Sequence, residues 1–364
     1  MTTIRAAVFR KAHEPLSIEA VEIDRPRDGE VLVRTVASGV CHSDLHYVDG
    51  ENELGPMGGP DGTVLGHEGA GIVEAVGDGV TYVRPGDHVV ACVSKFCGAC
   101  DQCLTGNTAR CRTSFRDFRR DRLRQGGRTV APFVGLGTYA EMMLVHQNNL
   151  VQIAPDIPLD RAALLGCGVT TGFGAALNTA QVRPGSRVAV FGCGGVGLSI
   201  VQGAYVAGAC VIVGVDTSAA KREMVLAANG THFVNAAEQD PVAAVRALTG
   251  GVDYAFEAVG LPALVRQCVE CLDVGGTAVV VGVQPTGAVF EIPSAALGGE
   301  KRLMTCTMGS NRFRVDIPRW LEFYRQGRLR LDEMVSARRP LDDINEAFRS
   351  MRAGEVARNV LVFE

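Results

Sequence analysis

Four cysteines lie close together in the sequence, with the spacing C-x₂-C-x₂-C-x₇-C: Cys97, Cys100, Cys103 and Cys111. Four thiolates this near one another can surround a single ion, and zinc suits four soft ligands with no open position. An iron–sulfur cluster is an alternative, although the ferredoxin spacing C-x₂-C-x₂-C-x₃-C-P is absent because Arg112 follows the last cysteine. Two disulfides, or four free thiols, would also be compatible with this spacing. The spacing favours a structural zinc site.

Three further metal-binding side chains are scattered along the chain. Cys41 follows a predicted strand, His67 lies with Glu68 in a predicted loop, and Cys167 lies where the pattern of the sequence changes. Each of them alone is more often a buried thiol or a hydrogen-bonded imidazole than a ligand. Together they form a Cys₂His set, which leaves the fourth tetrahedral position of a zinc ion open for water or substrate. The set therefore favours a catalytic zinc site.

A glycine-rich segment follows the predicted strand 187–191 and opens a predicted helix at Val196. It fits the pattern G-x-G-x-x-G with Gly192, Gly194, Gly195 and Gly197. In this pattern the first glycine permits a tight turn, the second lets the backbone approach a pyrophosphate, and the third lets the helix pack against the strand. The helix N-terminus offers free N–H groups to the phosphates. The alternative is a glycine-rich turn that binds nothing.

An acidic residue stands at the end of the next predicted strand. Asp216 ends the strand 210–215 and lies nineteen residues after Gly197. A carboxylate at this place can accept hydrogen bonds from both hydroxyls of the adenosine ribose, and it repels a 2′-phosphate. The pattern therefore favours NAD over NADP.

The elements that must position these groups follow different secondary-structure patterns in successive parts of the sequence. The first 165 or so residues are rich in short β-branched runs separated by turns, which predicts a β-rich part. From Gly166 strands alternate with helix-length segments, which predicts a parallel sheet with helices on both faces. The pattern changes again after Met308, towards two amphipathic segments and a terminal strand. The predicted strands of the alternating part are 187–191, 210–215, 253–257 and 277–283, and its predicted helices are 196–207, 219–229 and 261–272.

Length and composition exclude several classes of protein. At 364 residues and 47% hydrophobic residues, the chain is long enough for two folded domains and is not disordered. Its formal charge of −4 has no basic excess that would indicate nucleic acid or an acidic membrane as partner. No export signal is apparent, and the uncharged stretch 188–215 is too glycine-rich for a membrane span. A cytoplasmic location is expected, where thiols stay reduced.

These motifs resemble those of the zinc-dependent medium-chain alcohol dehydrogenases, and the resemblance runs from end to end. Its most specific segments are 39–44 (GVCHSD), 66–71 (GHEGAG), the four-cysteine lobe, 166–168 (GCG) and 192–199 (GCGGVGLS). The resemblance implies an α/β plus β-rich fold, in which a GroES-like catalytic domain is interrupted by a Rossmann nucleotide-binding domain. The expected boundaries are 1–170 for the catalytic domain with its zinc lobe, 171–307 for the NAD-binding domain and 308–364 for the C-terminal part of the catalytic domain.

The resemblance also implies roles for individual residues. Cys41, His67 and Cys167 bind the catalytic zinc, so that with the lobe each chain holds two zinc ions. Glu68 lies beside the metal, and Asp44 is the hydrogen-bond partner that sets the tautomer of the ligand histidine. Ser43 contacts the substrate oxygen, and His46 is the outer member of a proton relay. The further residues expected to contact NAD are His42, Thr171, Val196, Lys221 and Arg358.

The expected reaction is reversible hydride transfer between an alcohol, primary and either aliphatic or aromatic, and NAD. The alternative is a dehydrogenase for thiol adducts of formaldehyde, and a non-catalytic relative is disfavoured by the complete ligand set. Relatives of the alternative kind hold a carboxylate with a basic residue where Phe115 stands here, with Arg112 and Arg116 on either side. Eight arginines lie between positions 110 and 128, and a solvated basic loop is the simpler interpretation.

Two further expectations concern the surroundings of the metal and the assembly. Val93 and Phe133 are expected to line an apolar substrate pocket near the metal. Segments 277–283 and 303–308 match the place where nucleotide domains of the family join edge to edge, which predicts a homodimer, with a homotetramer as the alternative.

Overall fold

The structure is a computed structural model, and it describes residues 1–113 and 122–364. Phe115, at the position where relatives of the alternative kind hold a carboxylate, and its neighbour Arg116 lie outside the described residues. The chain divides into two compact units. The first unit contains Met1–Cys167, Arg312–Pro318 and Met334–Glu364, and the second contains Gly168–Asn311 and Arg319–Glu333.

The first unit contains a small closed barrel. Its strands follow one another around the barrel in the order β1 (Thr2–Phe9), β2 (Ser17–Ile23), β7 (Leu123–Gln125), β8 (Arg128–Pro132) and β4 (Thr63–Val64). Strands β1 and β2 are antiparallel over seven residue pairs, from Thr2 opposite Ile23 to Val8 opposite Ser17. The inward side chains of this barrel, including those of Ile4 and Val21, are buried.

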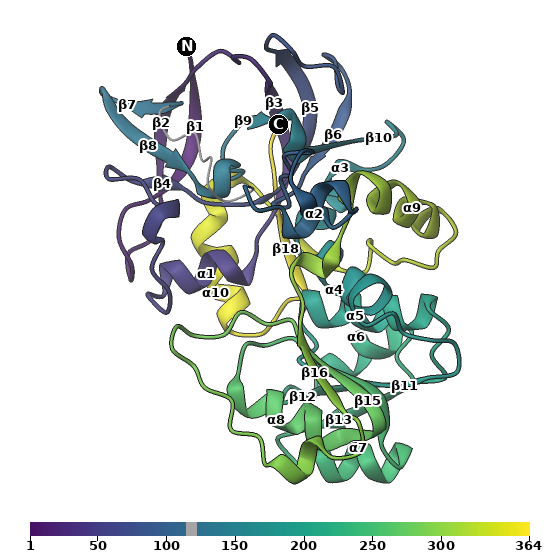
Figure 1. Cartoon of the computed structure of the whole chain (residues 1–364). Helices are drawn as coiled ribbons and strands as arrows, with labels where there is room; N and C mark the ends of the chain where they lie inside the picture. Colours follow the sequence, from purple (N-terminus) through teal and green to yellow (C-terminus); the bar gives the residue numbers. More distant parts are fainter. Residues whose placement is uncertain (114–121) are drawn as a thin grey trace. The chain divides into compact units, whose positions relative to one another are not determined.

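A second sheet in the same unit pairs the last strand of the chain with a strand from its first forty residues. Its order is β10 (Leu150–Ile153), β6 (His88–Ala91), β5 (Glu68–Val76), β3 (Glu30–Gly39), β18 (Arg358–Val362) and β17 (Val335–Arg339), and β9 (Met142–His146) also pairs with β3. The yellow strand β18 of Figure 1 runs antiparallel to β3, with Val360 opposite Gly39. Because of this pairing, a residue from the last strand of the sequence can reach groups near Cys41 and Glu68.

Short helices complete the first unit. They are α1 (His42–Val48), α2 (Asp101–Leu104), α3 (Leu159–Ala162) and α10 (Ile344–Arg352), while α9 (Phe313–Arg325) has residues in both units. The amphipathic helix α10 buries Ile344, Ala347 and Phe348 in the same core cluster as Leu45 of α1. Burial of such side chains is the main favourable term in folding.

The second unit is a doubly wound α/β sheet. Its six strands are in the order β13 (His232–Asn235), β12 (Val211–Asp216), β11 (Arg187–Phe191), β14 (Val252–Glu257), β15 (Leu272–Val280) and β16 (Arg302–Thr305), and all neighbours are parallel. The helices are α4 (Gly168–Gly174), α5 (Gly195–Val206), α6 (Lys221–Ala227), α7 (Pro241–Thr249) and α8 (Pro262–Cys271). The strand order reverses between β11 and β14, so the switch point at which such sheets bind ligands lies at their carboxyl ends. The expected α/β plus β-rich fold class is confirmed.

Two local predictions are corrected by the structure. Glu68 is the first residue of β5 rather than part of a loop. Strand β15 begins at Leu272, five residues before the predicted strand, and it ends at Val280 and not at Val283, since the N–H groups of Val281 and Gly282 both donate to the one carbonyl of Glu257.

The uncharged stretch 188–215 folds as β11, the glycine turn, α5 and β12, as the sequence predicts. In the part of the chain that the structure describes, no helix has both the length and the apolar character needed to cross a bilayer.

Candidate active site and cofactor site

Four metal-binding groups from three parts of the sequence lie together in the first unit. The donor atoms of Cys41, His67, Glu68 and Cys167 all lie within 4.8 Å of one another, and all four residues are buried. Cys41 immediately precedes α1, His67 and Glu68 stand at the start of β5, and Cys167 precedes α4. The three residues that the sequence analysis expects to bind a catalytic zinc are therefore brought together.

The imidazole of His67 is oriented by a buried carboxylate. Its Nδ1 lies 3.2 Å from Oδ1 of Asp44, which is fully buried. The same carboxylate accepts hydrogen bonds from the backbone N–H of Gly66 at 3.1 Å and from the hydroxyl of Tyr139 at 2.8 Å. This carboxylate accepts a hydrogen bond from the Nδ1–H of His67, which leaves Nε2 as the metal-binding nitrogen.

Tyr139 is a residue of this site that sequence reasoning missed. Its ring is fully buried and its hydroxyl reaches Asp44. It is a lone tyrosine 95 residues away from that carboxylate in the sequence, so no local spacing marks it. It reaches the site because its backbone pairs with Leu65 and Ala7 at the edge of the barrel.

Glu68 is paired with an arginine from the last strand. Nη2 of Arg358 donates a hydrogen bond to Oε2 of Glu68, and both side chains are buried. A side chain at Gly39 would collide with this carboxylate, because a Cβ there would lie 2.1 Å from Oε2. Arg358 is also expected to contact the pyrophosphate of the cofactor, and that role stays a prediction.

The electrostatics of the four groups suit a cation. A hydrogen bond from the Cys167 thiol holds the pKa of Cys41 well below its usual value, and His67 acts in the same direction. Burial opposes the charged form of His67, but the negative charges of Asp44 and Cys41 raise the pKa of its ring well above the ordinary value. The donor set therefore matches a catalytic zinc site: it has two sulfurs and one imidazole, and the far nitrogen of that imidazole is held by Asp44.

The four cysteines of the lobe also converge. The sulfurs of Cys97, Cys100, Cys103 and Cys111 lie within 4.8 Å of one another. The backbone N–H groups of Ala99 and Cys100 point at the sulfur of Cys97 at 3.4 and 3.3 Å. A hydrogen bond from the Thr113 hydroxyl, together with these two, lowers the pKa of Cys97 to about 5. Four thiols with backbone donors already aimed at one sulfur fit a closed tetrahedral zinc site.

Two arginines near the lobe, Arg112 and Arg122, are held by acidic partners. Arg112 makes two hydrogen bonds to Asp101, at 2.7 and 2.8 Å. Arg122 is only 2% exposed and pairs with Glu30 at 3.0 Å, while its Nη2 also donates to the carbonyl of Arg25. The expectation of a fully solvated basic loop is therefore wrong for Arg122, because a guanidinium so deeply buried requires a paired carboxylate.

The glycine turn of the second unit has the geometry that its pattern predicts. Gly192 has a φ of 91°, a conformation that favours glycine. A Cβ at Gly197 would lie 1.8 Å from the carbonyl oxygen of Gly192, so α5 packs directly against the turn. A Cβ at Gly194 would meet nothing within 4 Å, so this part of the turn is open to an approaching ligand. Gly195 and Val196 begin α5, whose free N–H groups suit a pyrophosphate.

Asp216 stands at the carboxyl end of β12, next to the turn. One of its oxygens accepts from the N–H of Cys193 at 2.8 Å, and the other accepts from the N–H of Ser218 at 2.9 Å. A carboxylate has about four acceptor positions, so it can still bind ribose hydroxyls. Of the further cofactor residues expected in this unit, Lys221 begins α6 and is buried, and Thr171 of α4 donates to the sulfur of Met308 at 3.5 Å.

The expected relay residues lie on one short helix. Ser43 and His46 are both partly exposed residues of α1, and His42 is its first residue. The ring of His46 packs edge-on against that of His42, with 5.1 Å between the centroids, and its Nδ1 bonds to the carboxylate of Glu51. The helix thus carries three polar groups directly after the proposed ligand Cys41.

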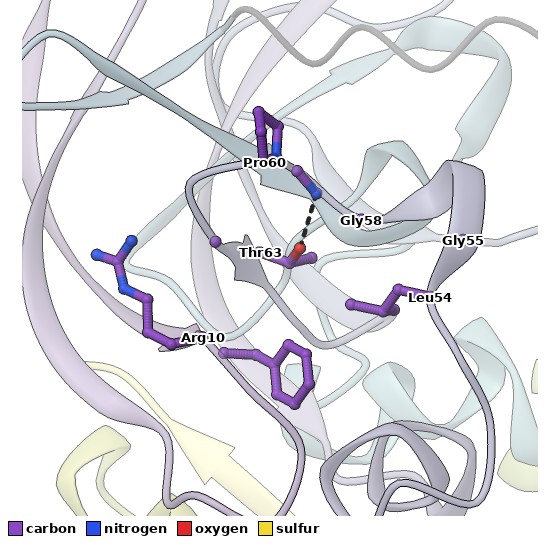
Figure 2. A pocket seen from close by; sticks show the side chains of 9 residues that line it. Arg10, Leu54, Gly55, Gly58, Pro60 and Thr63 are labelled. Atoms are coloured by element: carbon purple, nitrogen blue, oxygen red, sulfur yellow. Dashed lines mark hydrogen bonds between the residues drawn. The ribbon is translucent and has the colours of Figure 1, made fainter.

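An aromatic side chain lies beside the ligand set. The ring of Phe133 packs edge-on against that of His67, with centroids 5.6 Å apart, and Tyr47 packs on the same phenyl ring. A different hollow, of about 320 Å³, is lined by Phe9, Arg10 and residues of the loop from Leu54 to Thr63, whose side chains are drawn in Figure 2. None of the predicted site residues lines it, and the guanidinium of Arg10 is paired with Glu19.

Comparison with protein families finds two matches that together cover most of the chain. Residues 27–156 match the alcohol dehydrogenase GroES-like domain, and residues 195–324 match the zinc-binding dehydrogenase family.

Curated proteins and solved structures of similar length also match. The chain is 36% identical to an alcohol dehydrogenase class-3 of Cereibacter sphaeroides, with 99% of each chain covered. It is 35% identical to an S-(hydroxymethyl)glutathione dehydrogenase of Paracoccus denitrificans, again with 99% of each covered. The crystal structure of benzyl alcohol dehydrogenase from Acinetobacter calcoaceticus superposes with a TM-score of 0.93 at 34% identity, over 100% of both chains.

Proposed function

The chain belongs to the zinc-dependent medium-chain alcohol dehydrogenases, and from this we propose that Cys41, His67 and Cys167 hold its catalytic zinc, and Cys97, Cys100, Cys103 and Cys111 its structural zinc. The observation that carries the proposal is the buried convergence of two sulfurs and one imidazole within 4.8 Å, with Asp44 on the far nitrogen of that imidazole. Such a set leaves one tetrahedral position for the substrate.

The protein is an NAD-dependent alcohol dehydrogenase that interconverts an alcohol and an aldehyde or ketone by hydride transfer. When bound, zinc supplies a Lewis acid for the alcohol oxygen and NAD supplies the acceptor for the hydride. The chain's own residues orient the reactants and move the proton. Asp44 and Tyr139 hold the ring of His67 in one tautomer, and Arg358 holds the carboxylate of Glu68.

We infer that the proton of the alcohol leaves through Ser43 and then His46. The hydroxyl of Ser43 accepts the proton of the substrate hydroxyl while it donates its own proton onward. His46 receives the proton further out and releases it to solvent, and Glu51 holds its Nδ1 side. An imidazole suits this role because its unperturbed pKa of about 6.5 lies near neutrality.

For the cofactor, we propose that the glycine turn 192–197 and the start of α5 bind the pyrophosphate and that Asp216 binds the adenosine ribose. Lys221, Thr171, Val196, His42 and Arg358 are proposed as further contacts. The open space at Gly194 and the unused acceptor positions of Asp216 support this assignment.

For the substrate, we propose a primary alcohol with an apolar, preferably aromatic, body. Phe133 beside His67 supports this, as does the similarity to a benzyl alcohol dehydrogenase. The second candidate is a thiol adduct of formaldehyde, which is supported by the similarity to an S-(hydroxymethyl)glutathione dehydrogenase. The pairing of Arg112 with Asp101 and of Arg122 with Glu30 leaves these two guanidinium groups engaged, which disfavours them as anchors of an anionic substrate.

One experiment tests the metal assignment and the substrate together. Purified protein is analysed for zinc, and NAD reduction is measured with benzyl alcohol, ethanol, a secondary alcohol and S-(hydroxymethyl)glutathione. We expect two zinc ions per chain and the highest kcat/KM with benzyl alcohol. Fewer than two zinc ions would contradict the ligand assignment, and a higher kcat/KM with the glutathione adduct would favour the second candidate.

We also propose the arrangement of the chain and its assembly. Residues 1–170 and 308–364 form the catalytic domain, and residues 171–307 form the NAD-binding domain. A homodimer joined at the β16 edge is proposed, with a homotetramer as the alternative, because β16 ends the order of the parallel sheet. A reducing compartment, the cytoplasm, is proposed because zinc binding requires reduced cysteines.

A further inference from the structure

A buried carboxylate lies at the switch point of the parallel sheet, outside the machinery described above. Glu257 is the last residue of β14 and is fully buried. Its Oε1 accepts from the backbone N–H groups of Val259 at 2.7 Å and Gly260 at 2.6 Å. Its Oε2 accepts from the side-chain amide of Gln284 at 3.0 Å. Every polar contact is from a donor, which is the environment of an ionised carboxylate.

No cation among residues 1–113 and 122–364 pairs with this carboxylate. Among the residues that the structure describes, no arginine, lysine or histidine forms an ion pair with Glu257, whose partners are neutral N–H groups. Hydrogen bonds from neutral dipoles stabilise a buried charge but leave the net charge in place. The negative charge therefore acts on whatever is bound nearby, and the low dielectric constant around it strengthens that action.

The turn that Glu257 holds packs directly on the glycine turn. A Cβ at Gly192 would lie 2.4 Å from the side chain of Val259. A Cβ at Gly260 would lie 2.2 Å from the carbonyl oxygen of Val283, and one at Gly282 would lie 2.2 Å from the N of Gly260. The ends of β11, β14 and β15 are therefore interlocked around this one carboxylate.

The fold indicates which half of the cofactor lies near Glu257. In a doubly wound sheet the dinucleotide lies across the carboxyl ends of the strands, with its pyrophosphate at the first turn. Asp216, at the end of β12, marks the adenosine side of the glycine turn. The nicotinamide half then falls on the other side, over the ends of β14 and β15, where Glu257 stands.

We propose that Glu257 is a positioning residue whose charge favours the oxidised cofactor over the reduced one. The nicotinamide ring carries a positive charge in NAD⁺ and none in NADH, so a negative charge beneath its site stabilises NAD⁺ selectively. The same residue holds the turn 258–260 against Gly192. This inference rests on the proposed cofactor site, and it adds a residue that determines the redox preference of that site.

The test measures binding rather than turnover. Dissociation constants for NAD⁺ and NADH are measured by calorimetry and by NADH fluorescence, for the wild-type holoenzyme and for Glu257→Gln. The amide keeps an acceptor oxygen for the turn but removes the charge. We expect NAD⁺ to bind about tenfold more weakly while NADH binding changes less than about threefold. Glu322→Gln, which removes an exposed charge from α9 in the same unit, is the control and leaves the ratio unchanged.

A second variant returns the charge to the same place. In the double variant Glu257→Gln with Gln284→Glu, the amide and the carboxylate exchange positions across their 3.0 Å hydrogen bond. We expect the ratio of the two dissociation constants to return towards the wild-type value. An equal weakening of both cofactors in Glu257→Gln, an unchanged ratio, or no recovery in the double variant would overturn the proposal. Failure of the wild-type protein to bind either cofactor would instead contradict the proposed cofactor site.

Discussion

At the scale of single residues, the candidate active site depends on buried polar groups that hold one another. Asp44 makes three hydrogen bonds, to the ring of His67, the backbone of Gly66 and the hydroxyl of Tyr139. Partners of this kind orient metal ligands and raise their basicity, and their loss usually costs about 10- to 100-fold in metal affinity or activity. This network and the helix next to it can each be tested by substitution.

The first test concerns Tyr139, whose hydroxyl donates to Asp44, the carboxylate that orients the ligand histidine. Tyr139→Phe removes one hydrogen bond from Asp44 and leaves the ring in the core. We expect zinc at the Cys41–His67–Cys167 site to bind about tenfold more weakly, measured by competition with a chromogenic chelator. Tyr324→Phe removes an exposed hydroxyl–carboxylate bond to Asp332 and serves as the control. Equal zinc affinity in Tyr139→Phe and the wild type would refute the role given to this hydroxyl.

The second test concerns the order of the relay on α1. Ser43→Ala removes the group proposed to touch the reacting oxygen, so we expect kcat to fall by about 10²- to 10⁴-fold with zinc still bound. His46→Gln acts further out, where water replaces the imidazole, and we expect a loss of only about tenfold. Steady-state kinetics with metal analysis of both variants checks this. The relay is wrong as drawn if His46→Gln proves the more damaging change.

At the scale of elements, ion pairs join parts of the first unit that are distant in sequence. Asp160 of α3 receives hydrogen bonds from its neighbour Arg161 and from Arg338 of β17, 178 residues later. Its side chain is 14% exposed, so solvent screens this pair less than an ordinary surface pair. The helix and the edge strand of the sheet are thereby held together by charge.

The pH dependence of this contact can be measured. Burial opposes the ionisation of Asp160, but the two arginines outweigh burial and lower its pKa below the ordinary 3.8. Its contribution to stability is therefore present above about pH 4 and is lost as the pH falls through the lowered pKa. We expect Asp160→Asn to reduce the free energy of unfolding by about 1 kcal/mol at pH 7, with the difference shrinking as the pH falls below about 4.

Urea unfolding of both proteins across this pH range provides the measurement. The control is Asp342→Asn, because Asp342 and its partner Arg5 are both more than half exposed and their pair should contribute little. A difference for Asp160→Asn that persists undiminished at pH 2 would show that the lost contact is not electrostatic.

At the scale of the whole molecule, the parallel sheet ends in an open strand. Strand β16 pairs with β15 on one side and is the last strand in the order β13-β12-β11-β14-β15-β16. Two apolar side chains that precede β16 in the sequence are strongly exposed, Val274 of β15 at 77% and Val289 at 73%. Unpaired edges and exposed apolar groups are the features that association commonly covers.

We therefore expect the protein to be a dimer at micromolar concentration, measured by light scattering coupled to size-exclusion chromatography. Replacing Leu303 of β16 with proline removes a backbone N–H from this strand and should shift the population towards monomer. The control is Val335→Thr, a substitution at the start of β17, which belongs to the sheet of the first unit. A wild-type monomer would contradict the proposed assembly.

The sequence by itself determined the features that depend on local spacing. The four-cysteine lobe spans fifteen residues, and the glycine turn lies between β11 and α5, so neighbours in sequence are also neighbours in space. The alternation of strands and helices from Gly166 also predicts the doubly wound sheet, because hydrophobic periodicity follows directly from backbone geometry. The resemblance to a family supplied the joint role of Cys41, His67 and Cys167, which spacing alone could only suggest.

Only the tertiary structure decided the contacts that span the chain. Arg358 reaches Glu68 because β18 pairs with β3, and Tyr139 reaches Asp44 because its segment pairs with Leu65 and Ala7. In the sequence, Glu257 is only a polar residue at the end of an apolar strand. Its four hydrogen-bond donors, three in the following turn and one on Gln284, are brought to it by the fold. Such contacts depend on which strands pair and in which register, and that choice is made by the packing of the whole core rather than by any local pattern.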